Sequence, residues 1–142
     1  MDKNDLFYKF VAFTASVHRV THELTKNVKP DMITPLQYSL LENVKVSQPV
    51  TPSQISDCLH ISMPNTSREL RKLIEKNLIE KVEDSEDRRK QYICLSKNGE
   101  IIINEAFASI ESRFLSRIQN ASPEDLEEMS RALDVLHSKV FY

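Results

Sequence analysis

Apolar residues recur at both ends of the chain with the spacing of amphipathic helices. One stripe near the start comprises Leu6, Phe10, Phe13, Val17, Val20 and Leu24. Two later stripes are Ile103, Phe107, Ile110, Phe114 and Ile118, and then Leu126, Met129, Leu133, Leu136 and Val140. Steps of three and four residues place apolar side chains on one helical face. These faces could close on the middle of the same chain, but we expect them to bury against a second copy, as a homodimer.

Polar residues mark where four further helices begin. Thr34-Pro35-Leu36-Gln37 and Thr51-Pro52-Ser53-Gln54 each combine a hydroxyl cap, a proline at the first helical position and a glutamine three residues after the cap. Ser122-Pro123-Glu124-Asp125 follows the same pattern with acidic residues, which suit the positive end of a helix dipole. Ser62, before Met63 and Pro64, is a weaker version. The pattern predicts helices that start near residues 35, 52, 63 and 123.

One part of the chain has the character of β-structure. Residues 78–83 (LIEKVE) and 91–95 (QYICL) are short and rich in β-branched or aromatic side chains, and the charged run 84–90 separates them. They predict a two-stranded hairpin with a charged tip. The expected fold is mainly α with a small β-hairpin wing: one domain over 1–142, with a winged helix-turn-helix in 34–98 between dimerisation helices in 1–30 and 100–142.

Composition narrows the possible functions. The chain has 142 residues and a single glycine, Gly99, so it contains no glycine-rich phosphate loop. It also has no Ser/His/Asp or Cys/His arrangement around a recognisable nucleophile, so we expect neither an enzyme nor a bound cofactor. No segment approaches the length of a membrane span, and the charged start does not resemble a signal peptide. We therefore expect a cytoplasmic protein without a membrane partner.

Residues 51–77 have the pattern of a helix-turn-helix. Ile55, Cys58 and Leu59 give the first helix an apolar face, and Leu70, Leu73 and Ile74 give one to the second. Two short helices joined by a tight turn can place the second in the major groove of DNA. Polar side chains suited to base edges and phosphates fall on the opposite face of that second helix, namely Asn65, Thr66, Ser67, Arg68, Arg71 and Lys72. An ordinary solvated helix face is the alternative.

The predicted hairpin tip adds a second candidate contact with DNA. Arg88 and Arg89 stand side by side at the tip, followed by Lys90. Arginine is favoured in a narrow minor groove because of the enhanced negative potential there, and Asp87 is placed to orient a guanidinium beforehand. The four acidic residues between 83 and 87 keep open the alternative of a charged, solvated turn.

These residues together resemble the MarR (multiple antibiotic resistance regulator) family. The resemblance rests on Leu59-His60-Ile61-Ser62, Leu70, Leu78-Ile79, Asp87-Arg88-Arg89, Ile93-Cys94-Leu95-Ser96 and Gly99, and it extends over nearly the whole chain. It implies a dimeric repressor, occasionally an activator, that binds a pseudo-palindromic operator of double-stranded DNA until a small molecule, oxidant or metal weakens binding. The sequence departs from the family pattern at Asn77, Lys81 and Ser96, where Gly, Arg and Thr are frequent.

The resemblance also implies roles for individual residues. Residues 62–76 would form the recognition helix, Arg89 would reach the minor groove with Asp87 orienting it, and Arg88 would contact phosphate or support that pair. The full set of expected DNA-binding residues is Ser62, Asn65, Thr66, Ser67, Arg68, Arg71, Lys72, Asp87, Arg88, Arg89 and Lys90.

The sensing function is less clearly written in the sequence. The peroxide-sensing cysteine of some family members has no counterpart in residues 1–30, and we expect Cys58 and Cys94 to be reduced and buried. His18, His22 and Glu23 are too few to specify a metal site. The family implies a small-molecule effector site where the dimerisation helices meet the winged region, and Phe13, His18 and Tyr38 are candidate lining residues.

The charge balance leaves one alternative function open. Residues 51–97 carry nine basic and eight acidic residues, and the whole chain has a formal net charge of −2. Such a near-neutral region also suits a winged-helix module that binds other proteins and not DNA. A steep fall of DNA affinity with salt would distinguish the two, because contacts with phosphates release counterions.

Overall fold

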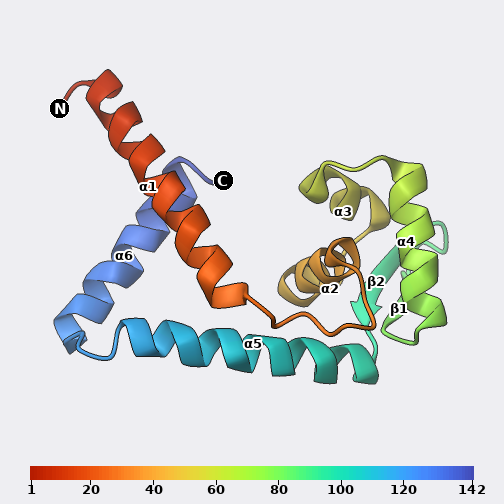
Figure 1. The fold of residues 1–142 in the computed structure, drawn as a ribbon. Helices are drawn as coiled ribbons and strands as arrows, with labels where there is room; N and C mark the ends of the chain where they lie inside the picture. Colours follow the sequence, from red (N-terminus) through yellow and green to blue (C-terminus); the bar gives the residue numbers. More distant parts are fainter. The chain divides into compact units, whose positions relative to one another are not determined.

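A computed structural model describes all 142 residues of the chain. The elements, in chain order, are α1 (Lys3–Thr25), α2 (Pro35–Ser47), α3 (Pro52–Leu59), α4 (Met63–Glu75), β1 (Ile79–Glu83), β2 (Gln91–Leu95), α5 (Lys97–Arg117) and α6 (Pro123–Lys139) (Figure 1). They form two compact units, residues 1–110 and 111–142, and α5 continues from one into the other. The expected fold class, mainly helical with one small antiparallel hairpin, is confirmed.

The helices begin where the polar signals predicted. Thr34, Thr51 and Ser122 each accept a hydrogen bond from the backbone N–H three residues later, and the side chain at that later position accepts one from the backbone N–H of the cap. Ser62 makes the first of these two bonds, with the N–H of Asn65 at 3.2 Å. Each cap satisfies N–H groups that have no partner within the helix.

Two helices of the winged region end at residues in the left-handed conformation. His60 closes α3 with φ 54°, and Asn77 follows α4 with φ 62°. Asparagine tolerates this conformation better than most residues that carry a Cβ, which explains how Asn77 replaces the expected glycine. The chain can therefore reverse direction after α4 and enter the hairpin.

The core lies among α2, α3, α4 and the hairpin. Its fully buried side chains include Leu40, Leu41, Ile55, Leu73 and Ile93. The predicted apolar faces of α3 and α4 point into it with one exception, because Cys58 is exposed. The expectation that Cys58 is buried is wrong: Ile55 and Ser56 are buried and Leu59 is half-buried, so the buried face of α3 is centred between these residues and Cys58 lies beyond its edge.

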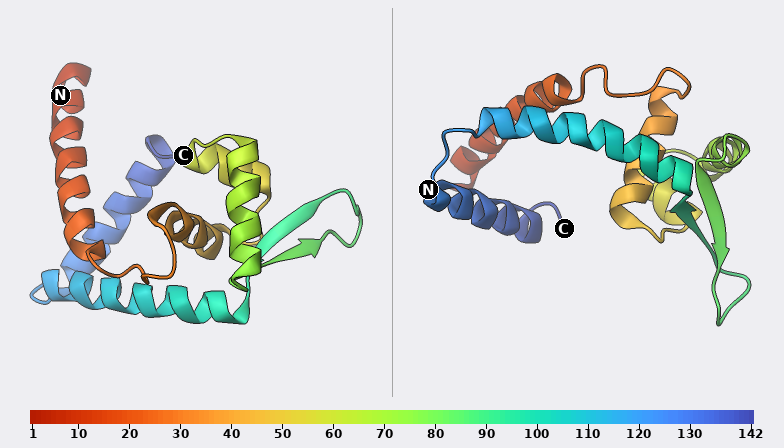
Figure 2. Two further views of the ribbon diagram at one scale, coloured as in Figure 1. Left: turned by 45° about the vertical axis from the view of Figure 1, so that its right-hand side comes forward. Right: turned by 90° about the horizontal axis from the view of Figure 1, so that it is seen from below.

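The hairpin is antiparallel, with Ile79 opposite Leu95 and Glu83 opposite Gln91. Val50 extends it by an isolated bridge to Ile93, with N···O distances of 3.2 and 2.7 Å. Ile79, Ile93 and Leu95 anchor its base in the core, whereas most side chains towards the tip are exposed. The hairpin therefore projects from the helices as a wing (Figure 2).

Gly99 is required where α5 starts beside the hairpin. Its N–H donates to Ser96 Oγ at 3.0 Å, and Ser96 in turn donates its own N–H to the Leu78 carbonyl oxygen. A Cβ on Gly99 would lie 2.0 Å from that Leu78 oxygen, far inside van der Waals contact. The single glycine of the chain thus permits a close approach between the start of α5 and the backbone just before β1.

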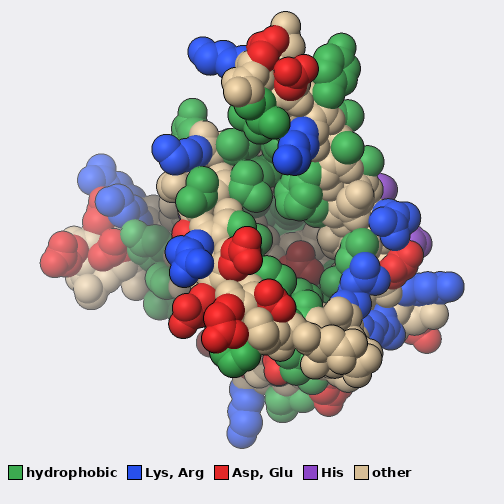
Figure 3. Space-filling model, turned by 90° about the vertical axis from the view of Figure 1, so that its left-hand side faces the viewer, with side chains coloured by type: hydrophobic (Ala, Val, Ile, Leu, Met, Phe, Trp, Pro, Cys, Tyr) green, Lys and Arg blue, Asp and Glu red, His purple; other side chains and the backbone are tan.

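Helices α1 and α6 bury no residue. Leu6, Phe13 and Val17 of the predicted first stripe are exposed, as are Leu126 and Leu133 of the last one. Figure 3 shows exposed hydrophobic side chains on one face of the molecule, interspersed with charged ones. The amphipathic pattern is confirmed, but within one chain the apolar faces remain uncovered.

Candidate nucleic-acid interface

The turn between α3 and α4 has a fixed shape. Ser56 Oγ donates to the Ile61 carbonyl oxygen, and the Ile61 N–H donates to the Ser56 carbonyl oxygen at 3.2 Å. With His60 in the left-handed conformation between them, these two bonds set how α4 leaves α3. Ser56 is a buried polar residue whose part in this turn our sequence reasoning missed, although its position one turn before the end of α3 is a usual place for a hydroxyl that bonds backbone.

Helix α4 presents a continuous polar face to solvent. Its buried positions are Thr66, Glu69, Leu70 and Leu73. Most of the expected DNA-binding side chains of this helix lie outside that stripe: Ser62, Ser67, Arg68, Arg71 and Lys72 are exposed, and Asn65 is half-buried. The face is therefore an accessible row of hydroxyl, amide and guanidinium groups.

Thr66 does not belong to this face. Its side chain is fully buried, and its hydroxyl donates to the Ser62 carbonyl oxygen at 2.9 Å. The prediction that Thr66 reaches DNA is therefore wrong. Thr66 lies one turn before Leu70 and two turns before Leu73, so it extends their buried stripe, and a polar residue type obscured that periodicity.

At the wing tip, Asp87 holds Arg89. Asp87 Oδ1 accepts the backbone N–H of Arg89 at 3.0 Å and its Nε at 3.2 Å. The Arg89 side chain is 91% exposed and that of Asp87 32% exposed. Arg88 and Lys90 are exposed beside this pair. The expected pairing of Asp87 with Arg89 is confirmed, and it leaves the guanidinium accessible.

A second carboxylate shapes the same tip. Asp84 Oδ1 accepts the N–H of Glu86 at 2.8 Å, and the Asp84 N–H donates to the Lys90 carbonyl oxygen at 3.1 Å. The Glu86 N–H, followed by weaker contributions from the Asp87 N–H and Lys90, holds the pKa of Asp84 below its usual range. Asp84 is therefore ionised at neutral pH and closes the turn from which Arg89 extends.

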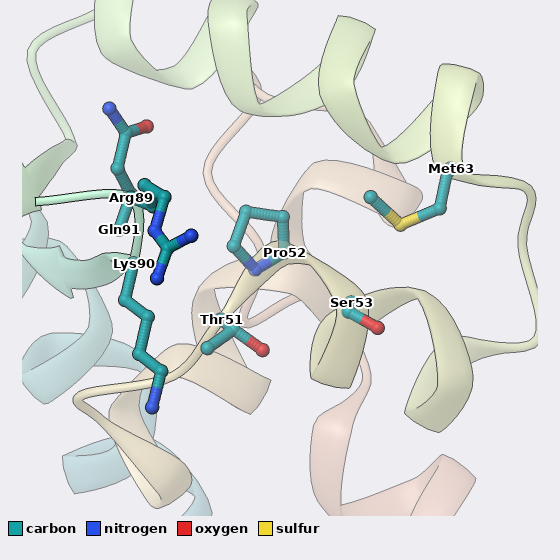
Figure 4. A pocket seen from close by; sticks show the side chains of 7 residues that line it. All are labelled: Thr51, Pro52, Ser53, Met63, Arg89, Lys90 and Gln91. Carbon is teal, nitrogen blue, oxygen red and sulfur yellow. The ribbon is translucent and has the colours of Figure 1, made fainter. Parts of the chain in front are cut away.

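A shallow hollow of about 410 Å³ separates the wing tip from the helix-turn-helix. Arg89, Lys90 and Gln91 line it from the hairpin, Thr51, Pro52 and Ser53 from the start of α3, and Met63 from the start of α4. In Figure 4 the Arg89 and Met63 side chains extend towards Pro52 from its two sides. The wing arginine and the start of α4 thus border the same open surface.

The candidate effector residues differ in exposure. Phe13 and His18 are exposed on α1, whereas Tyr38 is half-buried on α2 and packs against the core. Burial, and then the neighbouring Glu42 carboxylate, raise the pKa of Tyr38 to about 12. Tyr38 is therefore a neutral phenol at physiological pH.

Neither the two cysteines nor the other metal-ligating side chains form a further candidate site. Cys94 is half-buried, and the exposed Cys58 accepts a hydrogen bond from Asn43 Nδ2 at 3.0 Å. The structure contains no cluster of three or more His, Cys, Asp or Glu side chains arranged to hold a metal ion. None of its helices is both long enough and apolar enough to cross a membrane.

Comparison with known proteins agrees with this geometry. Residues 33–90 match the sequence model of the MarR family. A relative from Bacillus subtilis, the uncharacterized HTH-type transcriptional regulator YdgG, is 26% identical over 129 residues, which cover 89% of this chain and 82% of YdgG.

Solved structures share the fold. A MarR family protein from Bacillus stearothermophilus has a TM-score of 0.75 and 21% identity, over 100% of this chain and 99% of that one. Staphylococcus aureus MarR in complex with salicylate and kanamycin has a TM-score of 0.71 and 22% identity, over 96% and 93% of the two chains. The winged fold, the match over residues 33–90 and the regulator relative make this chain similar to transcriptional regulators of the MarR family.

Proposed function

We propose that the chain is a dimeric repressor that binds a pseudo-palindromic operator sequence-specifically and releases it when a small molecule binds. The proposal rests on two exposed polar surfaces that lie in the same compact unit, residues 1–110. One is the polar face of α4, and the other is Arg89, which Asp87 holds at the wing tip.

Helix α4 supplies the contacts with base edges. Its first residues follow a tight turn, as in recognition helices that enter the major groove. Arg68 and Arg71 suit guanine, and Asn65 suits adenine. The hydroxyls of Ser62 and Ser67 and the ammonium of Lys72 complete this side of the interface, where they bind phosphates or bases.

The wing supplies the minor-groove contact. Arg89 inserts there, and Asp87 keeps its guanidinium extended before DNA arrives, which lowers the entropy lost on binding. Arg88 and Lys90 contact phosphates on either side. Thr66 has no part in the interface because it is buried.

The apolar faces of α1 and α6 form the dimer interface. Exposed large apolar residues on them include Phe7, Val17, Leu126 and Leu133. Soluble monomers rarely leave large apolar helix faces in water, and a second copy offers matching faces by symmetry. Two-fold symmetry then sets two recognition helices against half-sites about one turn of DNA apart.

A small molecule regulates binding through the region where α1 joins the winged part. Phe13, His18 and Tyr38 are the proposed lining residues, because they combine two aromatic surfaces with an imidazole. The presence of salicylate and kanamycin in the Staphylococcus aureus MarR structure supports this class of effector.

The experiment that tests the function is selection from a random library of duplexes by the purified protein, followed by sequencing of the enriched pool. We expect a two-fold symmetric motif, and an affinity that falls steeply between 50 and 200 mM salt in a subsequent titration. Failure to enrich any motif at low salt would contradict the proposal and favour a winged-helix module that binds proteins.

A further inference from the structure

Gln37 connects the start of α2 with the recognition helix. It is almost completely buried, 2% exposed, and every polar group of its side chain is engaged. Its Oε1 accepts the Thr34 N–H at 3.1 Å and Lys76 Nζ at 3.0 Å, while its Nε2 donates to Glu69 Oε2 at 3.1 Å. One amide therefore caps α2 and holds α4 at two points.

The Glu69 carboxylate is the central point of attachment on α4. It is 8% exposed and lies on the buried stripe between Thr66 and Leu70. Its Oε2 accepts from Gln37, and its Oε1 lies 3.3 Å from Lys72 Nζ. A buried carboxylate strongly favours the helix rotation that keeps these partners, because any other rotation leaves charge without a partner.

Lys76, directly after α4, is the second point of attachment. Besides Gln37, its Nζ donates to the Met32 carbonyl oxygen at 2.7 Å. The segment that leads into α2 is also held by Lys29 Nζ, which donates to the Ile33 carbonyl oxygen at 2.7 Å. Gln37 thus joins the α1–α2 connection, α2 and α4 in one network.

We propose that Gln37 is a positioning residue for DNA recognition: through Glu69 and Lys76 it sets the rotation of α4 about its axis. This inference rests on the proposed function of α4 as the recognition helix. Arg68 precedes Glu69 directly, and Lys72 is one turn further on, so a rotation that displaced Glu69 would displace both of these side chains from the bases.

Apolar packing alone constrains this rotation less. Burial of Leu70 and Leu73 stabilises every rotation of α4 that keeps them in the core, because the hydrophobic effect has no direction. The Gln37–Glu69 hydrogen bond is directional and adds a narrow optimum. Gln37 therefore affects which DNA sequence is bound, although its side chain is not exposed to DNA.

The test is a reciprocal exchange of the two groups. Gln37→Glu keeps the acceptor for Thr34 and Lys76 but sets two carboxylates against each other at the contact with position 69. Glu69→Gln alone keeps a hydrogen bond to Gln37 and is the control. Combining the two changes restores a hydrogen bond with the donor now on α4.

The measurement is the affinity for the duplex enriched from the random library and for a duplex of unrelated sequence. We expect Gln37→Glu to lower the ratio of the two affinities by about tenfold or more, and the double variant to return it to within about threefold of the wild type. A general loss of phosphate contacts would cancel in this ratio. Unchanged specificity in Gln37→Glu, or a double variant no better than Gln37→Glu, would overturn the inference.

Two further variants, Lys76→Met and Arg89→Ala, complete the experiment. If Gln37→Glu fails to fold, Lys76→Met tests the network from its exposed end. We then expect a drop of about threefold or more in the same ratio, and a wild-type ratio would overturn the inference. Arg89→Ala reports on the proposed function separately: if Arg89→Ala weakens binding while the Gln37 variants do not, only the positioning role fails. If no duplex is enriched by the wild type, the proposed function itself fails.

Discussion

The Asp87 carboxylate accepts three hydrogen bonds from Arg89, from the backbone N–H at 3.0 Å, from Nε at 3.2 Å and from a terminal guanidinium nitrogen at 3.5 Å. The Arg89 side chain nonetheless remains 91% exposed. An exposed ion pair of this kind contributes little to stability, because water screens both charges. The arrangement instead restricts a long flexible side chain to one direction at the end of a projecting hairpin.

Arg89→Ala should therefore weaken binding to the selected duplex by about 1–3 kcal/mol, while the melting temperature stays nearly unchanged. Asp87→Asn should weaken binding in the same direction but less, because the guanidinium remains and only its orientation is lost. Fluorescence anisotropy at fixed salt measures both. Arg131→Ala, which removes an exposed arginine from α6, is the charge-matched control. If that variant lost as much DNA affinity, the effect of Arg89→Ala would come from the change in net charge and not from a contact made by the wing.

Thr66 and Ser67 are adjacent hydroxyl residues with opposite environments, the first buried and the second exposed. Thr66→Val should lower the free energy of unfolding by about 1 kcal/mol, through loss of the bond to the Ser62 carbonyl, and leave DNA affinity unchanged. Ser67→Ala should do the reverse. Urea denaturation and the same binding assay compare the pair, and a DNA-binding defect in a folded Thr66→Val protein would contradict the burial argument.

Leu133 is 65% exposed on α6, on the surface assigned to the dimer. Leu133→Glu should shift the protein towards the monomer in sedimentation velocity experiments, because it places a charge in an apolar interface. It should also weaken binding to the two-fold symmetric duplex. Val46, 74% exposed on α2, supplies the matched control: Val46→Glu should leave the oligomeric state intact. A wild type that sediments as a monomer at micromolar concentration would refute the assignment.

Gly99→Ala should destabilise the protein by at least about 2 kcal/mol, because the new Cβ meets the Leu78 carbonyl oxygen and the backbones must separate. Asn98 is the neighbouring exposed position, and Asn98→Ala should have little effect. Thermal unfolding followed by circular dichroism tests the difference. Equal stability of the two variants would mean that the start of α5 can shift freely.

The Glu100 carboxylate makes the stability of the fold depend on pH. Hydrogen bonds from Lys45 Nζ at 2.8 Å and Gln48 Nε2 at 3.0 Å hold its pKa below the ordinary value of 4.5. A lowered pKa in the native state stabilises the protein above pH 4.5, and that contribution is lost as the pH falls through the native pKa.

Glu100→Gln should accordingly cost up to about 1 kcal/mol at pH 7, with the difference from wild type shrinking towards pH 3. Urea denaturation across this range provides the measurement. A difference that grows as the pH falls would have the wrong sign for a carboxylate with a lowered pKa.

The sequence by itself determined the secondary-structure elements and the resemblance to the MarR family. Helix caps such as Thr34, Thr51 and Ser122, and apolar stripes with steps of three and four residues, involve groups only one or two helical turns apart. The sequence therefore shows all the interacting groups side by side. The Asp87–Arg89 pair was predictable for the same reason, because its members are two residues apart.

The tertiary structure decided which polar side chains face water. The predictions for Thr66 and Cys58 were wrong. Thr66 extends the buried stripe of Leu70 although it is polar, and the burial of Ser56 turns the inner face of α3 away from Cys58. Gln37 was predicted only as the capping glutamine of α2, and Glu69 was not predicted as a buried residue: they are 32 residues apart, and only the packing of α2 against α4 makes one the partner of the other. A buried polar residue can be recognised only with its partner, and that partner is brought to it by the fold.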